Sequence, residues 1–411
     1  MATIAVLGTF DTKGAEHAFL AECIRRRGHH VLLIDVGTGG PPQVTADISR
    51  DEVATASGID LAALMARGDR GECVAAMSTA APRTLERLQQ TGRIAGAISL
   101  GGGGGTAIAS AAMRALPLGF PKLIVSTLAA GNTAPYIGES DLVLMPSIVD
   151  IAGLNRISRM VLRRAAGAIC GMVESAVQPE DTSPARPLVV ASMFGNTTQC
   201  VGIAKEIIEQ AGYEVLTFHA TGAGGRMMEA TIAGGFVAGV LDITTTEWAD
   251  ELVGGVLSAG PLRLESAGRT GVPAVVVPGC LDMVNFGAPD TVPARFAGRK
   301  FYAHNPQVTL MRTNAEECAA LGGIIARKLN AYVGPITVML PLRGLSVIGA
   351  QGGPFHDPQA DAALFAALKS ALHPHIEVIE IDLEINAPPF ASSCAAALLT
   401  HLRASHRTST H

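Results

Sequence analysis

A run of five glycines supplies the first residues that could do chemistry. Gly101–Gly105 directly follows the apolar segment 94–100, and Thr106 precedes a predicted helix over 107–115. A backbone without side chains can approach a phosphate closely, and the amides and dipole at a helix start favour an anion. The Thr106 hydroxyl could bind the same phosphate or Mg²⁺. We therefore predict a phosphate-binding loop made of Gly101, Gly102, Gly103, Gly104, Gly105 and Thr106.

The competing interpretation of this run is a turn that only lets a helix pack closely on a strand. Five successive glycines are costly in conformational entropy, which favours the binding role. The chain has no GxxxxGK[ST] motif, and its first turn, Gly8–Gly14, lacks the GxGxxG spacing of a dinucleotide fingerprint. By analogy alone, the GGxGT pattern is closer to the phosphate loops of phosphofructokinase-like and lipid kinases.

Polar residues also follow the first two predicted strands. Lys13 could reach a phosphate and Asp11 could hold Mg²⁺ through water, although Asp11 could instead be the N-cap of a helix over 13–27. Asp35 ends the second strand and could bond a ribose hydroxyl. The carboxyl ends of parallel strands meet at one edge of a sheet, where ligands bind. We predict a nucleotide site there that joins the glycine loop to Gly8, Thr9, Asp11, Thr12, Lys13, Asp35, Asn132, Thr133 and Glu139.

The second half of the chain repeats the pattern of polar residues after apolar strands. This recurrence predicts a second ligand site, whose members are Asn196, Thr197, Thr198, His219, Thr245, Glu247, Arg263, Asn285 and Arg312. Arg263 and Arg312 could contact an anion, and Asp242 could bind a metal. Asp282 and His304 could do acid–base work. For each residue alone, a helix cap or a loop hydrogen bond is the alternative.

The elements that would position these residues alternate between strand and helix. Apolar segments at 3–7, 31–34, 94–100, 122–128 and 141–145 are predicted strands, and 153–177 is a predicted helix. The polar, proline-rich segment 178–187 is the predicted linker. Sliding the sequence by 184 residues aligns similar residues on each other, such as Val6 on Val190 and Gly28 on Gly212. We predict an α/β protein with two Rossmann-like domains, 1–180 and 187–405, each with a mainly parallel sheet flanked by helices.

Composition narrows the class of protein. Of 411 residues, 46 are glycine and 48% are hydrophobic, and the net charge is −5. These values exclude a disordered chain and argue against a nucleic-acid partner. The glycines lack the three-residue period of collagen. The seven cysteines contain no CxxC motif, so neither a structural zinc site nor a disulfide scaffold is predicted. There is no basic leader and no run of 18 apolar residues, so we expect a cytoplasmic protein without a membrane span.

Several long blocks of sequence resemble the UPF0261 family of Tm-1-like ATP-binding domain proteins. The blocks are 8–14, 101–106, 193–198, 218–222, 241–247, 278–287 and 304–306. The resemblance implies two Rossmann-like subdomains, ATP and Mg²⁺ as ligands, and a homodimer. It also implies a TIM-barrel partner that resembles phosphoenolpyruvate-handling enzymes, which we expect to be a separate chain. One departure is Gly349, where the resemblance leads us to expect an acidic residue, and this puts a ligand contact by that loop in doubt.

Three functions are compatible with these predictions, and the sequence leaves open whether the protein is an enzyme. The first is ATP–Mg²⁺ binding, coupled to a small anionic metabolite through binding or phosphoryl transfer. The second is a non-catalytic nucleotide-sensing scaffold for the TIM-barrel partner. The third is a metal-dependent lyase or hydrolase that uses the residues of the second half.

Overall fold

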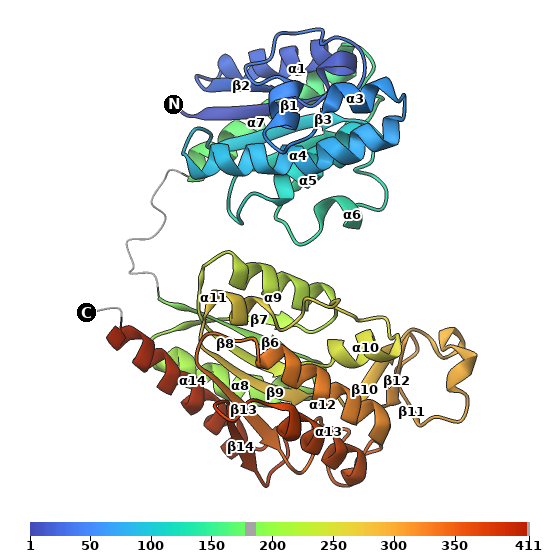
Figure 1. The fold of residues 1–411 in the computed structure, drawn as a ribbon, viewed down its shortest axis with the longest axis vertical. Helices are drawn as coiled ribbons and strands as arrows, with labels where there is room; N and C mark the ends of the chain where they lie inside the picture. The colour runs from blue at the N-terminus through green and yellow to red at the C-terminus, as the bar shows by residue number, and fades with distance from the viewer. Residues whose placement is uncertain (177–185, 409–411) are drawn as a thin grey trace. The chain divides into compact units, whose positions relative to one another are not determined.

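The computed structural model describes residues 1–176 and 186–408, and it divides the chain into two compact units, Met1–Ser183 and Pro184–His411 (Figure 1). For comparison, the predicted domains are 1–180 and 187–405. Most of the predicted linker at 178–187 lies outside the described residues. Among those that are described, no helix is both long and apolar enough to cross a membrane.

The N-terminal unit is a five-stranded parallel sheet in the order β2-β1-β3-β4-β5. Helices α1 and α7 pack on one face, and α4 and α5 pack on the other. The strands are β1 (Thr3–Gly8), β2 (His30–Asp35), β3 (Gly96–Gly101), β4 (Lys122–Ser126) and β5 (Val143–Pro146), and the helices are α1 (Phe10–Arg25), α2 (Arg50–Thr55), α3 (Leu61–Ala66), α4 (Arg70–Gln90), α5 (Gly103–Arg114), α6 (Ala134–Ile137) and α7 (Arg156–Ala176).

The C-terminal unit is a six-stranded sheet in the order β14-β13-β9-β8-β6-β7, with a separate three-stranded sheet β10-β12-β11. Helices α8 and α14 pack on one face of the large sheet, and α9, α12 and α13 pack on the other. The strands are β6 (Leu188–Met193), β7 (Glu214–His219), β8 (Val237–Thr244), β9 (Ala274–Gly279), β10 (Met283–Phe286), β11 (Phe301–Asn305), β12 (Val308–Arg312), β13 (Ile336–Pro341) and β14 (Glu377–Ile381). The helices are α8 (Thr198–Gln210), α9 (Ala223–Ala233), α10 (Glu247–Val253), α11 (Ser266–Thr270), α12 (Ala315–Leu329), α13 (Pro358–Ala371) and α14 (Pro388–Thr408).

The two units share one order of connections. The first strand of each unit, β1 or β6, pairs in parallel with the next strand on one side and with the strand after that on the other side. The order of strands therefore reverses beside β1 in one unit and beside β6 in the other. This confirms the predicted α/β fold with two Rossmann-like sheets. At such a reversal the chain leaves neighbouring strands in opposite directions, which opens a crevice at their carboxyl ends.

Two helix starts differ from the sequence prediction, and both matter for the site. The predicted helix over 107–115 begins earlier, because α5 includes Gly103, Gly104 and Gly105. The predicted turn at 8–14 is largely helical, because α1 begins at Phe10. In each case the helix begins within two residues of the preceding strand, so two helix N-termini lie at the carboxyl edge of the sheet.

Candidate functional site

A cavity of about 410 Å³ lies at the point where the strand order of the N-terminal unit reverses. Its walls come from the segments that follow β1, β2 and β3 and from α3 and α4. The lining residues are Thr9, Asp11, Thr12, Lys13, Thr38, Gly39, Met65, Gly68, Asp69, Arg70, Cys73, Val74, Gly102, Gly103, Gly104, Gly105 and Ile108. The volume falls within the range of small-molecule sites, about 300–1,000 Å³.

The glycine loop forms one wall of this cavity as the first turn of α5. Gly102 is the N-cap residue and provides no side-chain cap, so the amides of Gly103, Gly104 and Gly105 have no acceptor within the helix. A Cβ on Gly103 would meet no atom within 4 Å, whereas a Cβ on Gly101 would lie 2.9 Å from the carbonyl carbon of Gly105. Gly101 is therefore required for packing, and Gly103 leaves space above the helix start.

The structure gives Thr106 a different role from the predicted one. Its side chain is fully buried. The hydroxyl bonds the carbonyl oxygen of Gly101 at 3.2 Å and the Ser126 hydroxyl at 2.7 Å. Thr106 thus fixes α5 to β3 and β4 and does not line the cavity.

The opposite wall is the first turn of α1. The N-cap of α1 is Thr9, not Asp11, and the helix has a kink at Lys13, where φ is −133° and ψ is 30°. The Asp11 carboxylate accepts a hydrogen bond from the Gly39 amide at 2.6 Å. A Cβ on Gly39 would lie 2.7 Å from that carboxylate. The Lys13 ammonium donates to the carbonyl oxygen of Ile151.

Asp35 and Gly8 lie behind this wall and support it. One oxygen of the buried Asp35 carboxylate accepts from the amides of Phe10 at 3.0 Å and Gly37 at 2.8 Å. Asp35 therefore positions the start of α1 and the loop after β2. It does not line this cavity, where it was predicted to bond a ribose hydroxyl. A Cβ on Gly8 would lie 1.8 Å from the His17 ring. Burial lowers the pKa of His17 to about 4, so this ring is a neutral packing group.

The structure does not bring Asn132, Thr133 or Glu139 to the cavity. They belong to the segment around α6, and none of them is among the lining residues. The Asn132 side chain accepts a hydrogen bond from the Ala134 amide at 3.2 Å. This local contact forms a turn before α6.

Sequence reasoning missed the wall contributed by α3 and α4. The lining residues that were not predicted are Thr38, Gly39, Met65, Gly68, Asp69, Arg70, Cys73, Val74 and Ile108. Asp69 caps α4 by accepting from the Glu72 amide at 3.0 Å. Arg70 then occupies the first helical position, where the helix dipole disfavours a cation. That placement is a signal in the sequence that could have identified Arg70.

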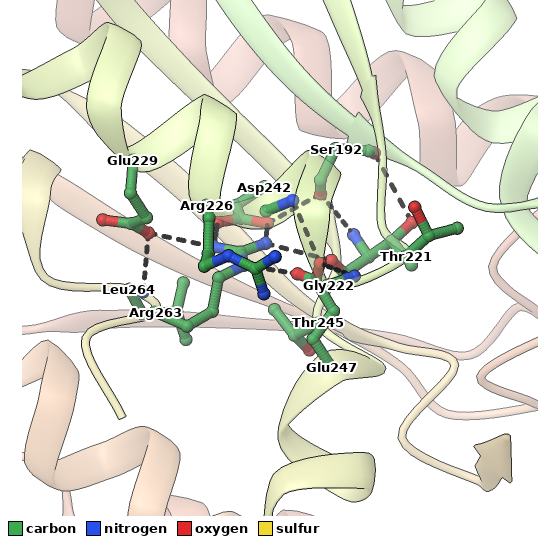
Figure 2. A network of polar contacts seen from close by, with 12 residues as sticks. Ser192, Thr221, Gly222, Arg226, Glu229, Asp242, Thr245, Glu247, Arg263 and Leu264 are labelled. Atoms are coloured by element: carbon green, nitrogen blue, oxygen red, sulfur yellow. Dashed lines mark hydrogen bonds and ion pairs between the residues drawn. The ribbon is translucent and has the colours of Figure 1, made fainter. Parts of the chain in front are cut away.

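In the C-terminal unit, the predicted anion contact Arg263 is enclosed by acidic side chains (Figure 2). Its two terminal nitrogens bond Asp242 at 2.6 and 2.7 Å, and its Nε bonds Glu247 at 2.7 Å. Glu229 lies 3.2 Å from Nη1. Arg263 is 1% exposed, so its charge is neutralised inside the protein.

The same network occupies the start of α9. One Glu247 oxygen accepts from the amides of Gly222 at 2.7 Å and Gly225 at 3.0 Å (Figure 2). A carboxylate of the protein thus fills the position that a ligand anion would take. Asp242, predicted as a metal ligand, instead pairs with Arg263 and accepts from Ser192 at 2.6 Å. Within the described residues, no group of three or more His, Cys, Asp or Glu side chains could hold a metal ion.

The other predicted residues of the second site are mostly used in internal hydrogen bonds. Arg312 pairs with Asp361 at 2.6 Å, and the Asn285 amide group donates to Asp250 at 2.6 Å. The remaining contacts join Thr197 to Thr244, Thr198 to the Phe194 carbonyl, Thr245 to the Val277 carbonyl, and the Asn196 carbonyl to Asn386. Of this set, Thr198 and His219 are exposed, and the His219 ring contacts the Phe194 ring in a tilted arrangement, with centroids 5.3 Å apart.

Asp282 and His304 do not form an acid–base pair. Asp282 is fully buried, and one of its oxygens accepts from Ser346 at 2.6 Å. Burial raises the pKa of Asp282. His304 is exposed on β11. A Cβ on Gly349 would lie 2.2 Å from Asp282 Oδ2, so this packing has no space for an acidic side chain at 349.

Comparisons with known proteins give one family for both units. Residues 2–178 match the model described as "Uncharacterised protein family (UPF0261) N-terminal domain", and 186–402 match the model for the C-terminal domain. A UPF0261 protein of Clostridium tetani is 47% identical over 96% of this chain and 98% of its own length. The ToMV susceptible protein tm-1(GCR26) of Solanum lycopersicum is 40% identical over 96% of this chain, which spans 55% of the tomato protein. A solved UDP-N-acetylglucosamine 2-epimerase from Rickettsia bellii has a TM-score of 0.22 and 11% identity over 66% of this chain and 78% of that chain.

Proposed function

The chain belongs to the UPF0261 family, and we propose that its N-terminal unit binds ATP with Mg²⁺ in the cavity beside the glycine loop. The observation that carries this proposal is the uncapped start of α5, where the amides of Gly103, Gly104 and Gly105 have no helical acceptor and line a cavity of about 410 Å³. A helix start of this kind attracts phosphate through its amides and its dipole.

The lining of the cavity combines apolar and polar groups in a way that suits a nucleotide. Met65, Val74 and Ile108 provide apolar surface against which a purine ring would pack. Thr12, Lys13 and the glycine loop provide hydrogen-bond donors, and Val74 lies directly beside Gly104 of that loop. An apolar surface with a few placed polar groups is the common form of a small-molecule site.

Asp11 is the residue that would hold Mg²⁺. Only one of its carboxylate oxygens accepts from the Gly39 amide, so lone pairs remain for a bound water or the ion. Asp69 is the other carboxylate that lines the cavity, and it caps α4, so most ligands of the ion would be phosphate oxygens and water, as is usual for Mg²⁺. The ion would neutralise part of the phosphate charge.

Lys13 would supply the second cation. Its ammonium donates to the Ile151 carbonyl, a neutral acceptor. A phosphate oxygen is a stronger acceptor for an ammonium group, because both partners are charged. On nucleotide binding we expect Lys13 to exchange the Ile151 carbonyl for a phosphate oxygen.

Calorimetric titration of the full chain with ATP, with and without Mg²⁺, tests this proposal. We expect one site per chain and tighter binding with Mg²⁺. Asp11→Asn can keep the Gly39 contact through its amide oxygen but removes the charge, so the effect of Mg²⁺ should decrease. The proposal fails if the wild-type chain does not bind ATP under either condition.

The packing of the C-terminal unit favours a protein that binds the nucleotide without transferring its phosphoryl group. The groups predicted to hold an acceptor metabolite, Arg263, Glu247 and Arg312, are occupied in internal ion pairs. We therefore favour the nucleotide-sensing role over phosphoryl transfer. An assay of ADP release in the presence of saturating ATP distinguishes them, and sustained turnover would contradict the sensing role. Homodimerisation, a TIM-barrel partner and cytoplasmic location remain predictions from the resemblance and the composition.

A further inference from the structure

Arg70 places a cation at the cavity for which the fold supplies no acceptor. Its Nη2 lies 3.8 Å from the position that a Cβ on Gly104 would take, which places the guanidinium beside the first turn of α5. Within residues 1–176 and 186–408, it makes no hydrogen bond or ion pair. The nearby acidic groups are used elsewhere, because Asp69 caps α4 and Glu72 pairs with Arg67 at 3.1 Å.

The position of Arg70 in its helix does not explain its presence. It is the first residue of α4, where the positive end of the helix dipole repels a cation. Glu72 in the same turn has the favoured charge. The guanidinium therefore gains no stabilisation from its own helix, and it lies beside a second helix start of the same positive character at α5. Arg70 is exposed to water, and an anion placed between it and the start of α5 would gain favourable interactions from both.

We propose that Arg70 binds a phosphate group of the nucleotide together with the first turn of α5, and that it thereby makes the site select nucleotides by their phosphates. This inference rests on the proposed function. A guanidinium presents several N–H donors in a planar fork that matches two phosphate oxygens. The amides of Gly103 and Gly104 supply donors to the same group from the helix side.

The proposal also explains how the site would discriminate between nucleotides. Arg70 and α5 contribute donors on one side, and Lys13 contributes an ammonium from α1, another wall of the same cavity. A polyphosphate chain offers oxygens to both, whereas a monophosphate occupies one of them. Adenosine has no group for either. The expected order of affinity is therefore ATP, then AMP, then adenosine.

Titration of four proteins with ATP–Mg²⁺, AMP and adenosine tests the role of Arg70. The proteins are the wild type, Arg70→Ala, Arg70→Lys and the matched control Arg67→Ala, which removes a neighbouring arginine of the same surface. We expect Arg70→Ala to weaken ATP binding about 10- to 100-fold, the range for losing a hydrogen-bonded charge. Its adenosine affinity should remain within about twofold, because adenosine has no phosphate. Arg70→Lys should recover part of the loss, and its ATP affinity should still fall with rising salt.

Three results would overturn the inference in different ways. If Arg70→Ala binds ATP as tightly as the wild type, Arg70 does not contact a phosphate. If ATP and adenosine weaken equally, Arg70 acts on the shape of the cavity and does not select phosphates. If the wild type binds adenosine but not ATP, both the inference about Arg70 and the proposed function fail. Circular dichroism melting of each variant separates these results from unfolding, and the exposed Arg70 side chain makes no contact that folding requires.

Discussion

Single residues at the carboxyl ends of the strands have different environments in the two units. Asp11 and Lys13 of the N-terminal unit line a cavity, where Asp11 accepts from the Gly39 amide and the Thr12 hydroxyl and Lys13 donates to the Ile151 carbonyl. Arg263 and Glu247 of the C-terminal unit bond to each other and are buried. A buried charge is tolerated when it is paired and hydrogen-bonded. We therefore assign the Arg263–Glu247 pair a role in the stability of the fold.

Replacing Arg263 tests that assignment. Arg263→Met leaves the carboxylates of Asp242 and Glu247 buried without their counter-charge, which should lower the free energy of unfolding by about 3–5 kcal/mol. Arg269→Ala is the matched control, because Arg269 is 58% exposed and its pair with Glu265 is long at 3.6 Å. Denaturant unfolding measures both. A loss below about 1 kcal/mol for Arg263→Met, the value of a surface pair, would contradict the structural role.

Asp250 predicts a pH dependence of stability. Burial raises the pKa of its carboxyl group to about 7, although Asn285 donates to it twice. The unfolded chain ionises near pH 4, so between about pH 4 and 7 the folded state binds the extra proton. Stability contributed by this group is therefore lost as pH rises through that window, by up to about 1.4 kcal/mol per pH unit.

Thermal unfolding of Asp250→Asn between pH 5 and 8 measures this contribution. The variant cannot ionise at 250, so the fall in stability between pH 5 and 7 should be shallower than in the wild type. Glu251→Gln removes an adjacent exposed carboxyl group and is the matched control. Identical slopes for the wild type and Asp250→Asn would show that Asp250 is ionised throughout.

The roles of some of these residues could be predicted from the sequence, and the roles of others could not, for a physical reason. The glycine loop could be predicted, because its strand, turn and helix are continuous in the chain. The neutralisation of Arg263 could not, since its acidic partners Asp242, Glu247 and Glu229 lie on or beside three different elements. These residues of β8, α10 and α9 come together only in the folded unit.

At the scale of elements, each unit has a glycine-containing helix start after a parallel strand, α5 after β3 and α9 after β7, and the two starts are satisfied differently. The start of α5 is capped by no side chain, whereas Glu247 caps the start of α9. The strands of both large sheets could be predicted from their apolar runs. The small sheet β10-β12-β11 could not, because β11 is exposed along its whole length and lacks the apolar pattern of a buried strand.

The loop after β5 should respond to nucleotide binding. Lys13 donates to Ile151 and Glu16 accepts from the Gly153 amide at 2.6 Å, so two residues of α1 hold this loop. When Lys13 turns to a phosphate, only the second of these two hydrogen bonds to α1 remains. Hydrogen exchange should therefore become faster at 148–152 and slower at 103–105 when ATP and Mg²⁺ are added.

Lys13→Met is the control for this coupling. In this variant the Ile151 contact is already absent, so exchange at 148–152 should be fast without nucleotide and should not accelerate further. If the same acceleration occurs in Lys13→Met and in the wild type, Lys13 does not connect the cavity to the loop.

At the scale of the whole molecule, the two units share one order of strands, but only the N-terminal unit leaves its glycine-containing helix start open. Both units reverse their strand order beside the first strand, and the family match covers both. The high glycine content has a structural explanation in each unit. Gly103 leaves space over an open helix start, whereas a Cβ on Gly225 would lie 2.2 Å from the Glu247 carboxylate that closes the other start.

Calorimetric titration of Gly103→Asp and Gly103→Ala with ATP and Mg²⁺ tests the central proposal most directly. Both substitutions place a Cβ in open space, so both proteins should fold like the wild type. The alanine variant should bind ATP within about threefold of the wild type, and the aspartate should weaken binding more than about 100-fold, because it places a negative charge where the phosphate is expected. Equal ATP affinity in the two variants would show that the nucleotide does not bind at the glycine loop.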